Sequence, residues 1–350
     1  MLEFINISGT NLLSSRIALG TWAMGGWMWG GTDEKESIRT IHAALDLGIN
    51  LIDTAPVYGF GRSEEIVGEA LRQYGRRESV ILASKVGLDW TSGNVERNST
   101  RERILREVKD SLGRLQTDYI DIYQVHWPDP LVPVEETAAT LRELYEQGKI
   151  RAIGVSNYSP EEMARFGAVA PLHTIQPPFN LFEREIERDV LPYAVGRGIT
   201  TLTYGALCRG LLSGAMRTDR QFANDDMRKT TDPKFQPAHF AEYLTAVSKL
   251  DTFAREKFGK RVIHLAVRWL LDQPGVGVAL WGARRPEQLA PIREVFGWAL
   301  GKTDFAAIDA ILRENIRNPV GPEFMAPPVR ETVEPVTVSV RQSKSFGGQS

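Results

Sequence analysis

The sequence predicts a closed (β/α)8 barrel, the TIM-barrel fold, and three observations support this prediction. Eight short apolar runs recur along the chain, and helical patterns lie between them. The runs are almost continuously hydrophobic, which is typical of parallel strands buried on both faces. The chain has 350 residues, and α/β barrels often reach this length as a single domain. Eight strands that each lead into a helix would close into a barrel.

The strands are expected at short segments rich in Ile, Val and Leu. They are 16–21, 50–55, 80–85, 120–126, 150–157, 173–178, 199–205 and 275–282. Residues before the first strand would form a small N-terminal β-hairpin that closes the bottom of the barrel. The segment 205–238, after the seventh strand, is too long for an ordinary connection and is therefore expected to be a functional loop.

Helix ends are marked by capping patterns. Ser99 with Glu102 predicts a capping box at the start of one helix, and Ser159 with Glu162 predicts a second one. Residues 1–328 are expected to form the barrel domain. Residues 329–350 are rich in Ser, Gly and Val without a helical period, so they are expected to form a loosely ordered C-terminal tail.

Composition excludes several classes of function. The net charge of -2 gives no general attraction to nucleic acid or to an anionic membrane, so neither is expected as a partner. Cys208 is the single cysteine, which excludes an internal disulfide and a thiolate zinc cluster. The N-terminus has no pattern of a signal peptide, and no apolar run approaches the length of a membrane helix. A cytoplasmic protein without a metal site is expected, and the sequence does not indicate an oligomeric state.

Polar and ionisable side chains stand where several predicted strands end. Asp53 closes one strand and Tyr58 follows in the next loop, while Lys85 and His126 end the two strands after it. Each has a simple explanation alone: a capping carboxylate, a packed phenol, a solvated amine, a hydrogen-bonded imidazole. However, a charge or an imidazole that ends an apolar strand is costly without a partner, and active sites of barrels lie at this end. We therefore expect the four side chains to converge.

This group of side chains suits proton donation by a phenol. A nearby ammonium stabilises a phenolate and lowers the pKa of tyrosine from about 10. We expect Lys85 to act on Tyr58 in this way, with Asp53 holding Lys85 charged and in place. His126 would donate a hydrogen bond to a substrate carbonyl oxygen. Tyr58 would then be the general acid for carbonyl reduction and the base in reverse, and the hydride would come from a nicotinamide cofactor.

Several motifs resemble the aldo-keto reductase superfamily. They are DTAPVYGFGRSEE (53–65), the lysine of ILASK, the histidine of QVHWPD, and GKIRAIGVSN (148–157). The resemblance runs from about residue 5 to about residue 328, and it implies a (β/α)8 barrel that uses NADP(H) through an Asp–Tyr–Lys–His tetrad. The stretches GTWAMGGWMWGG, YGALCRGLL, ALWGARRPEQ and FMAPP resemble the bacterial group of NADP-dependent glycerol dehydrogenases and glyceraldehyde reductases.

The resemblance also implies which residues hold the cofactor. Ser156, Asn157 and Gln176 would bind the carboxamide of the nicotinamide, and Tyr204 would stack on its ring. The loop from Gly205 through Gly214 would cover the pyrophosphate with backbone N–H groups. The other residues expected at this site are Gly20, Thr21, Trp22, Asp53, Ala206, Leu207, Cys208, Arg209, Gly210, Gly282 and Ala283.

The adenosine end of the cofactor is expected near the last strand. No GxGxxG motif follows the first strand, so a Rossmann-type site is not expected. Arg284 and Arg285 precede a predicted helix, which favours phosphate, although a solvated charge pair is the simpler explanation. The resemblance places Arg284 at the 2′-phosphate, which favours NADP(H), and Gln288 at the ribose. Relatives often carry Lys at the position of Ala215 and Asn at that of Ile292, so two contacts depart from the pattern.

Tryptophans are concentrated in loops at the active end of the predicted barrel. Most tryptophans in proteins belong to a core, but five here lie beside glycine or polar residues. They are Trp22, Trp27, Trp29, Trp90 and Trp127. We expect a substrate pocket whose walls exclude water. Indole N–H groups could also bind hydroxyls, so the walls do not choose between a polyol and a bulky ketone. The pocket is expected to be lined by Trp22, Trp29, Tyr58, Trp90, His126 and Trp127, and Trp27 lies in the same loops.

The predicted function is reversible, NADP(H)-dependent reduction of aldehydes or ketones to alcohols, with glyceraldehyde or glycerol as the first candidate substrate. One alternative is a dehydrogenase of bulkier ketones or secondary alcohols. Another is a regulatory subunit that senses the cofactor and turns over slowly, as some relatives do for ion channels. The third alternative is a protein with the same barrel fold that uses a different cofactor. The rate of turnover distinguishes an enzyme from a sensor, because a sensor would bind NADPH tightly but consume it slowly.

Overall fold

A closed barrel of eight parallel strands forms the centre of the molecule, as predicted. The computed structural model describes residues 1–331. The strands lie in the order β10-β11-β12-β3-β4-β5-β8-β9, and each corresponds to one of the expected apolar runs. Their bounds are β3 Ile17–Gly20, β4 Leu51–Asp53, β5 Ile81–Val86, β8 Ile122–Val125, β9 Ile153–Ser156, β10 Thr174–Gln176, β11 Thr200–Thr203 and β12 Val276–Gly282.

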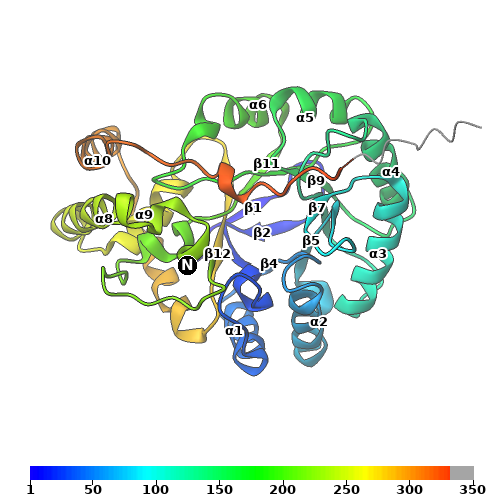
Figure 1. Ribbon diagram of the computed structural model, residues 1–350, viewed down its shortest axis with the longest axis horizontal. Helices are drawn as coiled ribbons and strands as arrows, with labels where there is room; N and C mark the ends of the chain where they lie inside the picture. The colour runs from blue at the N-terminus through cyan, green and yellow to red at the C-terminus, as the bar shows by residue number, and fades with distance from the viewer. Residues whose placement is uncertain (332–350) are drawn as a thin grey trace, which may run out of the picture.

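Helices surround the barrel (Figure 1). They are α1 Glu34–Asp46, α2 Arg62–Tyr74, α3 Arg101–Leu115, α4 Val134–Glu146, α5 Pro160–Gly167, α6 Val190–Arg197, α7 Met227–Thr230, α8 Pro237–Phe258, α9 Val262–Leu271 and α10 Lys302–Asn315. Short 3-10 helices are η1 Trp22–Gly25, η2 Arg77–Ser79, η3 Glu185–Glu187, η4 Cys208–Ser213, η5 Pro233–Phe235, η6 Pro286–Val295 and η7 Glu323–Met325. The helix expected after the last strand is therefore the 3-10 helix η6.

One predicted capping box is confirmed and the other is wrong. The Ser159 side chain accepts from Glu162 N, and the Glu162 carboxylate accepts from Ser159 N, so α5 has a complete box. The first residue of α3 is Arg101, and its N-cap is Thr100, whose hydroxyl accepts from Arg103 N. Ser99 lies one residue before this N-cap, and its backbone N–H donates to the Asp129 carboxylate at 3.0 Å and not to Glu102.

Side-chain parity along the strands decides what lies inside the barrel. Successive residues of a strand point to opposite faces, so residues two apart share a face. In β4, Leu51 belongs to the cluster that fills the barrel interior, and Ile52 belongs to the layer between strands and helices. Asp53 therefore points inward above Leu51. The N-terminal hairpin consists of β1 Phe4–Asn6 and β2 Leu13–Ser15. Ile7, which follows β1, is buried in the cluster that fills the barrel interior, as expected for a hairpin that closes the bottom of the barrel.

The C-terminal segment crosses the barrel. In Figure 1 its orange-to-red ribbon runs from α10 over the barrel to β7, which spans Glu96–Arg97 and pairs with β6, Leu88–Asp89. Arg97 donates to the carbonyl oxygen of Pro327 at 2.9 Å, and Val329 forms an isolated bridge with Arg97. The segment predicted to be a tail therefore begins with residues that are held in place. The rest of that predicted tail, 332–350, lies outside the described residues.

Candidate active site

The four side chains predicted at the strand ends meet inside the barrel. Lys85 Nζ lies 2.6 Å from Asp53 Oδ1 and 3.2 Å from the Tyr58 hydroxyl. It also donates to the carbonyl oxygen of Thr54 at 3.1 Å, so three acceptors surround the ammonium. The rings of Tyr58 and His126 lie edge to face, with centroids 5.7 Å apart. Because Lys85 is fully buried and Asp53 is 4% exposed, this ion pair is shielded from water.

The loop that carries Tyr58 is held by a close approach of two backbones. Tyr58 follows β4, and its neighbour Gly59 packs against Gly25 at the end of η1. A Cβ atom on Gly25 would lie 2.5 Å from the Tyr58 carbonyl, and one on Gly59 would lie 2.1 Å from the Gly25 carbonyl oxygen. Real side chains cannot approach so closely, so both positions require glycine. This contact between Gly25 and Gly59 therefore restrains the backbone of Tyr58 relative to the end of β4.

Burial controls the protonation of these groups. Burial raises the pKa of Tyr58 well above its usual value, and the Asp53 carboxylate raises it further. Burial and then the Lys85 charge lower the pKa of His126 well below its usual value, so the imidazole is neutral. The net shift is therefore opposite to the expected one, because burial, the larger cause, and the Asp53 carboxylate outweigh the Lys85 ammonium that lies 3.2 Å from the hydroxyl. The phenol stays protonated, as a proton donor must be.

Three polar residues expected at the nicotinamide form a connected network beside Tyr204. The Ser156 hydroxyl donates to the Gln176 carbonyl oxygen at 2.6 Å. Asn157 donates from Nδ2 to the His126 carbonyl oxygen at 2.9 Å and to the Ser156 hydroxyl at 3.0 Å. The Tyr204 hydroxyl donates to Asn157 Oδ1 at 2.9 Å. Asn157 Oδ1 therefore keeps one lone pair, and Gln176 Oε1 accepts from none of the described residues, so both can accept from the NH2 group of an amide.

A cavity of about 1340 Å³ opens over these residues. It is larger than the 300–1,000 Å³ of typical small-molecule pockets, so it has room for a dinucleotide and a substrate together. Its lining includes most of the residues expected for the cofactor and four of the five loop tryptophans, Trp22, Trp27, Trp29 and Trp127, together with Trp281 of β12. Apolar side chains missed from sequence also line it: Val57, Leu88, Val95, Phe324 and Met325. The last two lie in the C-terminal segment, whose course over the barrel the sequence did not indicate.

Four predicted site residues do not line this cavity: Lys85, which lies behind Asp53 and Tyr58, and Thr21, Cys208 and Trp90. Thr21 is fully buried, and its hydroxyl donates to the Asp53 carbonyl oxygen at 2.9 Å. Cys208 is also fully buried, and burial raises the pKa of its thiol to about 12. Trp90 packs on Phe60 outside the cavity, and the guanidinium of Arg103 lies 5.0 Å from its ring. Thr21 and Cys208 therefore lie in the core next to the cavity, where they cannot contact a ligand directly. The expectation that Trp90 lines the substrate pocket is wrong.

The arginines after β12 lie at the far end of the cavity. Arg284 donates to the carbonyl oxygens of Trp29, at 2.8 Å, and Gly31. Backbone N–H groups of Arg284 and Arg285 donate to Gln288 Oε1 at 2.7 and 3.1 Å. A guanidinium has five N–H donors, so three of those on Arg284 are not used by any residue of the described range 1–331 and could bind an anion. Ala215 lines the cavity, whereas Ile292 is buried in the core and does not.

A buried cluster of four charges fixes the loop after β11. Arg209 bonds the carboxylates of Glu183 and Asp232, and Lys234 bonds Glu183 at 2.8 Å and the Gly321 carbonyl oxygen at 3.1 Å. Burial alone would raise the pKa of Glu183, but the two cations outweigh it and lower that pKa to about 2. Arg209 has a φ of 53°, which is strained for a residue with a side chain. The cluster therefore holds this loop in a strained shape and ties it to the C-terminal segment.

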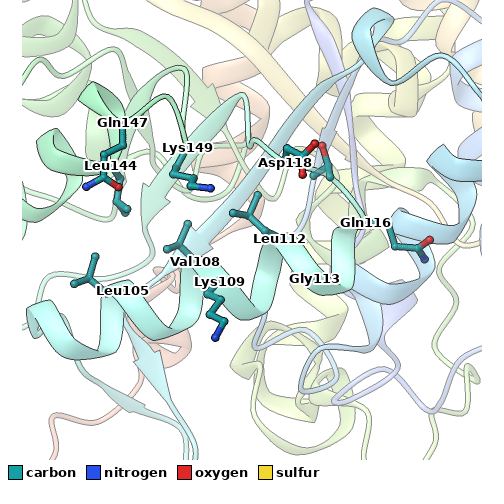
Figure 2. A pocket seen from close by; sticks show the side chains of 11 residues that line it. Leu105, Val108, Lys109, Leu112, Gly113, Gln116, Asp118, Leu144, Gln147 and Lys149 are labelled. Atoms are coloured by element: carbon teal, nitrogen blue, oxygen red, sulfur yellow. The ribbon is translucent and has the colours of Figure 1, made fainter.

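A second hollow, of about 580 Å³, lies on the outside of the barrel (Figure 2). It is lined by residues of α3 together with the end of α4 and the turn after it, including Leu105, Leu112, Leu144 and Lys149. None of the predicted site residues reaches it. No helix in the described part of the chain has the length and apolar character needed to cross a membrane.

Comparison with known proteins agrees with this geometry. Residues 16–313 match the sequence profile of the Aldo/keto reductase family. The chain belongs to this family. It is 62% identical, over 95% of its length and all of the relative's, to aldo-keto reductase YhdN of Bacillus subtilis. It is 35% identical, over 82% of its length and 91% of the relative's, to the NADH-specific methylglyoxal reductase of Escherichia coli.

A solved structure of a related enzyme has the same fold as this chain. The glycerol dehydrogenase AKR11B4 from Gluconobacter oxydans superposes with a TM-score of 0.82 and is 54% identical. The match covers 92% of this chain and 99% of that one. Both the fold and membership of this oxidoreductase family are therefore established.

Proposed function

We propose that this aldo/keto reductase reduces small aldehydes and ketones with NADPH, and that glyceraldehyde is the substrate to test first. The observation that carries the proposal is the buried contact of Lys85 with both Asp53 and the Tyr58 hydroxyl, at the wall of the large cavity. The resemblance to a glycerol dehydrogenase supports the choice of glyceraldehyde. The reverse reaction, oxidation of glycerol, follows from the same geometry.

Each residue of the tetrad has a role in this proposal. Tyr58, which burial keeps protonated, donates its proton to the carbonyl oxygen of the substrate. The Lys85 ammonium, 3.2 Å away, stabilises the phenolate that remains, and Asp53 keeps Lys85 charged. Neutral His126 donates a hydrogen bond to the carbonyl oxygen and orients it. When bound, the nicotinamide cofactor supplies the hydride.

Three features of the cavity support binding of a dinucleotide. Asn157 and Gln176 offer acceptor oxygens for the carboxamide, Tyr204 offers a ring face, and Arg284 offers a phosphate three N–H donors that no described residue uses. Arg284 supports NADPH over NADH because only NADPH carries a 2′-phosphate. Ala215 stands where relatives often carry a lysine, and a relative is described as NADH-specific. The preference therefore needs a direct comparison of both cofactors.

The test is the loss of NADPH absorbance with glyceraldehyde, compared between the wild type and Tyr58→Phe. We expect Tyr58→Phe to lower kcat by about 10²-fold or more while NADPH binding stays nearly unchanged, since general acid catalysis contributes 10²–10⁴-fold. An undiminished rate would rule out Tyr58 as the acid. Binding of NADPH with little turnover on any carbonyl would instead support the cofactor-sensing alternative.

A second candidate substrate class is a bulkier, flatter ketone. The wall formed by Trp22, Trp127 and Phe324 is apolar and aromatic, which suits such a compound. A panel that pairs glyceraldehyde with aromatic ketones separates the two candidates. A higher kcat/KM for the aromatic compounds would favour the bulky-ketone alternative.

A further inference from the structure

The carboxylate of Asp53 has two oxygens, and only one of them faces Lys85. Oδ1 accepts from Lys85 Nζ at 2.6 Å, whereas Oδ2 accepts from Gln176 Nε2 at 2.8 Å and from Gln124 Nε2 at 3.4 Å. Gln124 Oε1 in turn accepts from Gln176 Nε2 at 3.4 Å. The carboxylate and the two amides thus form a closed ring of hydrogen bonds. Gln124 is fully buried and Gln176 is 2% exposed, so water does not compete with this ring.

The ring fixes which way the Gln176 amide points. A carboxylate only accepts hydrogen bonds, so both glutamines must turn their NH2 groups toward Asp53. Gln176 Oε1 is then the atom left to accept from a ligand in the cavity that Gln176 lines. Asp53 Oδ2 is the nearer acceptor of the Gln176 NH2 group, at 2.8 Å, and Gln124 Oε1 is the second one, at 3.4 Å. Gln124 therefore contacts both groups that set this orientation, the Asp53 carboxylate and the Gln176 amide.

Strand geometry explains how Gln124 reaches this place. Gln124 lies two residues before His126, so both point into the barrel. Its partner in register on β9 is Gly154, which pairs with Thr174 on β10. A Cβ atom on Gly154 would lie 2.7 Å from Gln124 Cγ and 2.2 Å from Thr174 Oγ1. Glycine is costly inside a buried strand, and here its missing side chain leaves the space that Gln124 occupies.

We propose that Gln124 is a positioning residue, which fixes the second oxygen of Asp53 and the orientation of Gln176. Through these two contacts it links the cofactor end of the site to the Lys85–Tyr58 pair. The kinetic part of this inference rests on the proposed reductase function, whereas the binding part requires only that the chain binds NADPH.

The test is a double-mutant cycle on NADPH affinity, measured by quenching of tryptophan fluorescence. We expect Gln124→Met, which keeps the volume and removes the hydrogen bonds, to raise the Kd for NADPH about fivefold, because a net hydrogen bond contributes about 1 kcal/mol. In a Gln176→Met background the same change should alter the Kd by less than about twofold. Tyr123→Phe is the matched control, because its buried hydroxyl on the same strand has no partner among the described residues. We expect that variant to bind like the wild type.

The results that would overturn the inference are specific. A Kd within twofold of the wild type for folded Gln124→Met, or an equal effect in both backgrounds, would contradict it. Wild-type protein that binds NADPH without turnover would refute the proposed reductase function, and the Kd cycle would still decide the role of Gln124.

Gln124→Glu provides a second readout if Gln124→Met does not fold. This variant places two carboxyl groups side by side, so the new group should carry a proton at low pH and lose it as the pH rises. We expect its kcat to fall between about pH 6 and pH 8, where the wild type is flat. A flat profile that matches the wild type would contradict the inference.

Discussion

Replacing Lys85 by methionine should affect stability and activity by separable mechanisms. The ion pair between Lys85 Nζ and Asp53 is 2.6 Å long and almost completely buried. Removing one partner leaves the Asp53 carboxylate without its compensating charge, which costs about 3–5 kcal/mol of unfolding free energy. The Tyr58 phenolate also loses a charged donor at 3.2 Å, so we expect kcat to fall by about 10²–10³-fold, as when one oxyanion donor is lost.

The double variant Asp53→Asn/Lys85→Met separates the two effects. It removes both charges, so it should recover more than half of the lost stability, while its kcat stays as low as that of Lys85→Met. The assays are urea unfolding and NADPH oxidation with glyceraldehyde. The reasoning would be refuted if the double variant were no more stable than Lys85→Met, or if it regained activity.

Four further predictions follow from other parts of the site. Arg284→Ala should raise the KM for NADPH much more than for NADH, and an equal effect on both would exclude its role at the 2′-phosphate. Gly25→Ala forces a methyl group to within 2.5 Å of the Tyr58 carbonyl, so kcat should fall at least about tenfold, whereas Gly113→Ala, which meets nothing within 4 Å, should not change it. The pKa of Glu183 is lowered to about 2, so its contribution of about 3 kcal/mol is present above pH 4.5 and lost as the pH falls toward 2; acid-unfolding curves of Glu183→Gln should lack this part. Burial keeps the Tyr58 phenol protonated, so the reduction rate should be flat from about pH 6 to pH 9, and a decline centred in that range would contradict this.

The positions of the tetrad residues in the sequence were informative because a parallel barrel constrains them. Asp53, Lys85 and His126 end strands that are neighbours in the barrel, and parallel strands bring their ends to one side. Gln124 carries the same signal, since it is polar and lies in the inward phase of its strand, two residues before His126. Strand parity could therefore have identified it. Trp90 shows the limit of this reasoning, because a position in a loop gives no direction for the side chain.

The sequence by itself determined the barrel, the strand ends and the four residues proposed as the tetrad, because hydrophobic periodicity and residue order can be read along the chain. Only the tertiary structure decided which contacts are made between residues of different strands and loops. The backbone contact of Gly25 with Gly59, the course of the C-terminal segment over the barrel, and the balance of charges around Tyr58 all depend on distances between residues far apart in the chain. Burial outweighs the nearby ammonium in setting the pKa of Tyr58, and burial is a property of the folded chain alone.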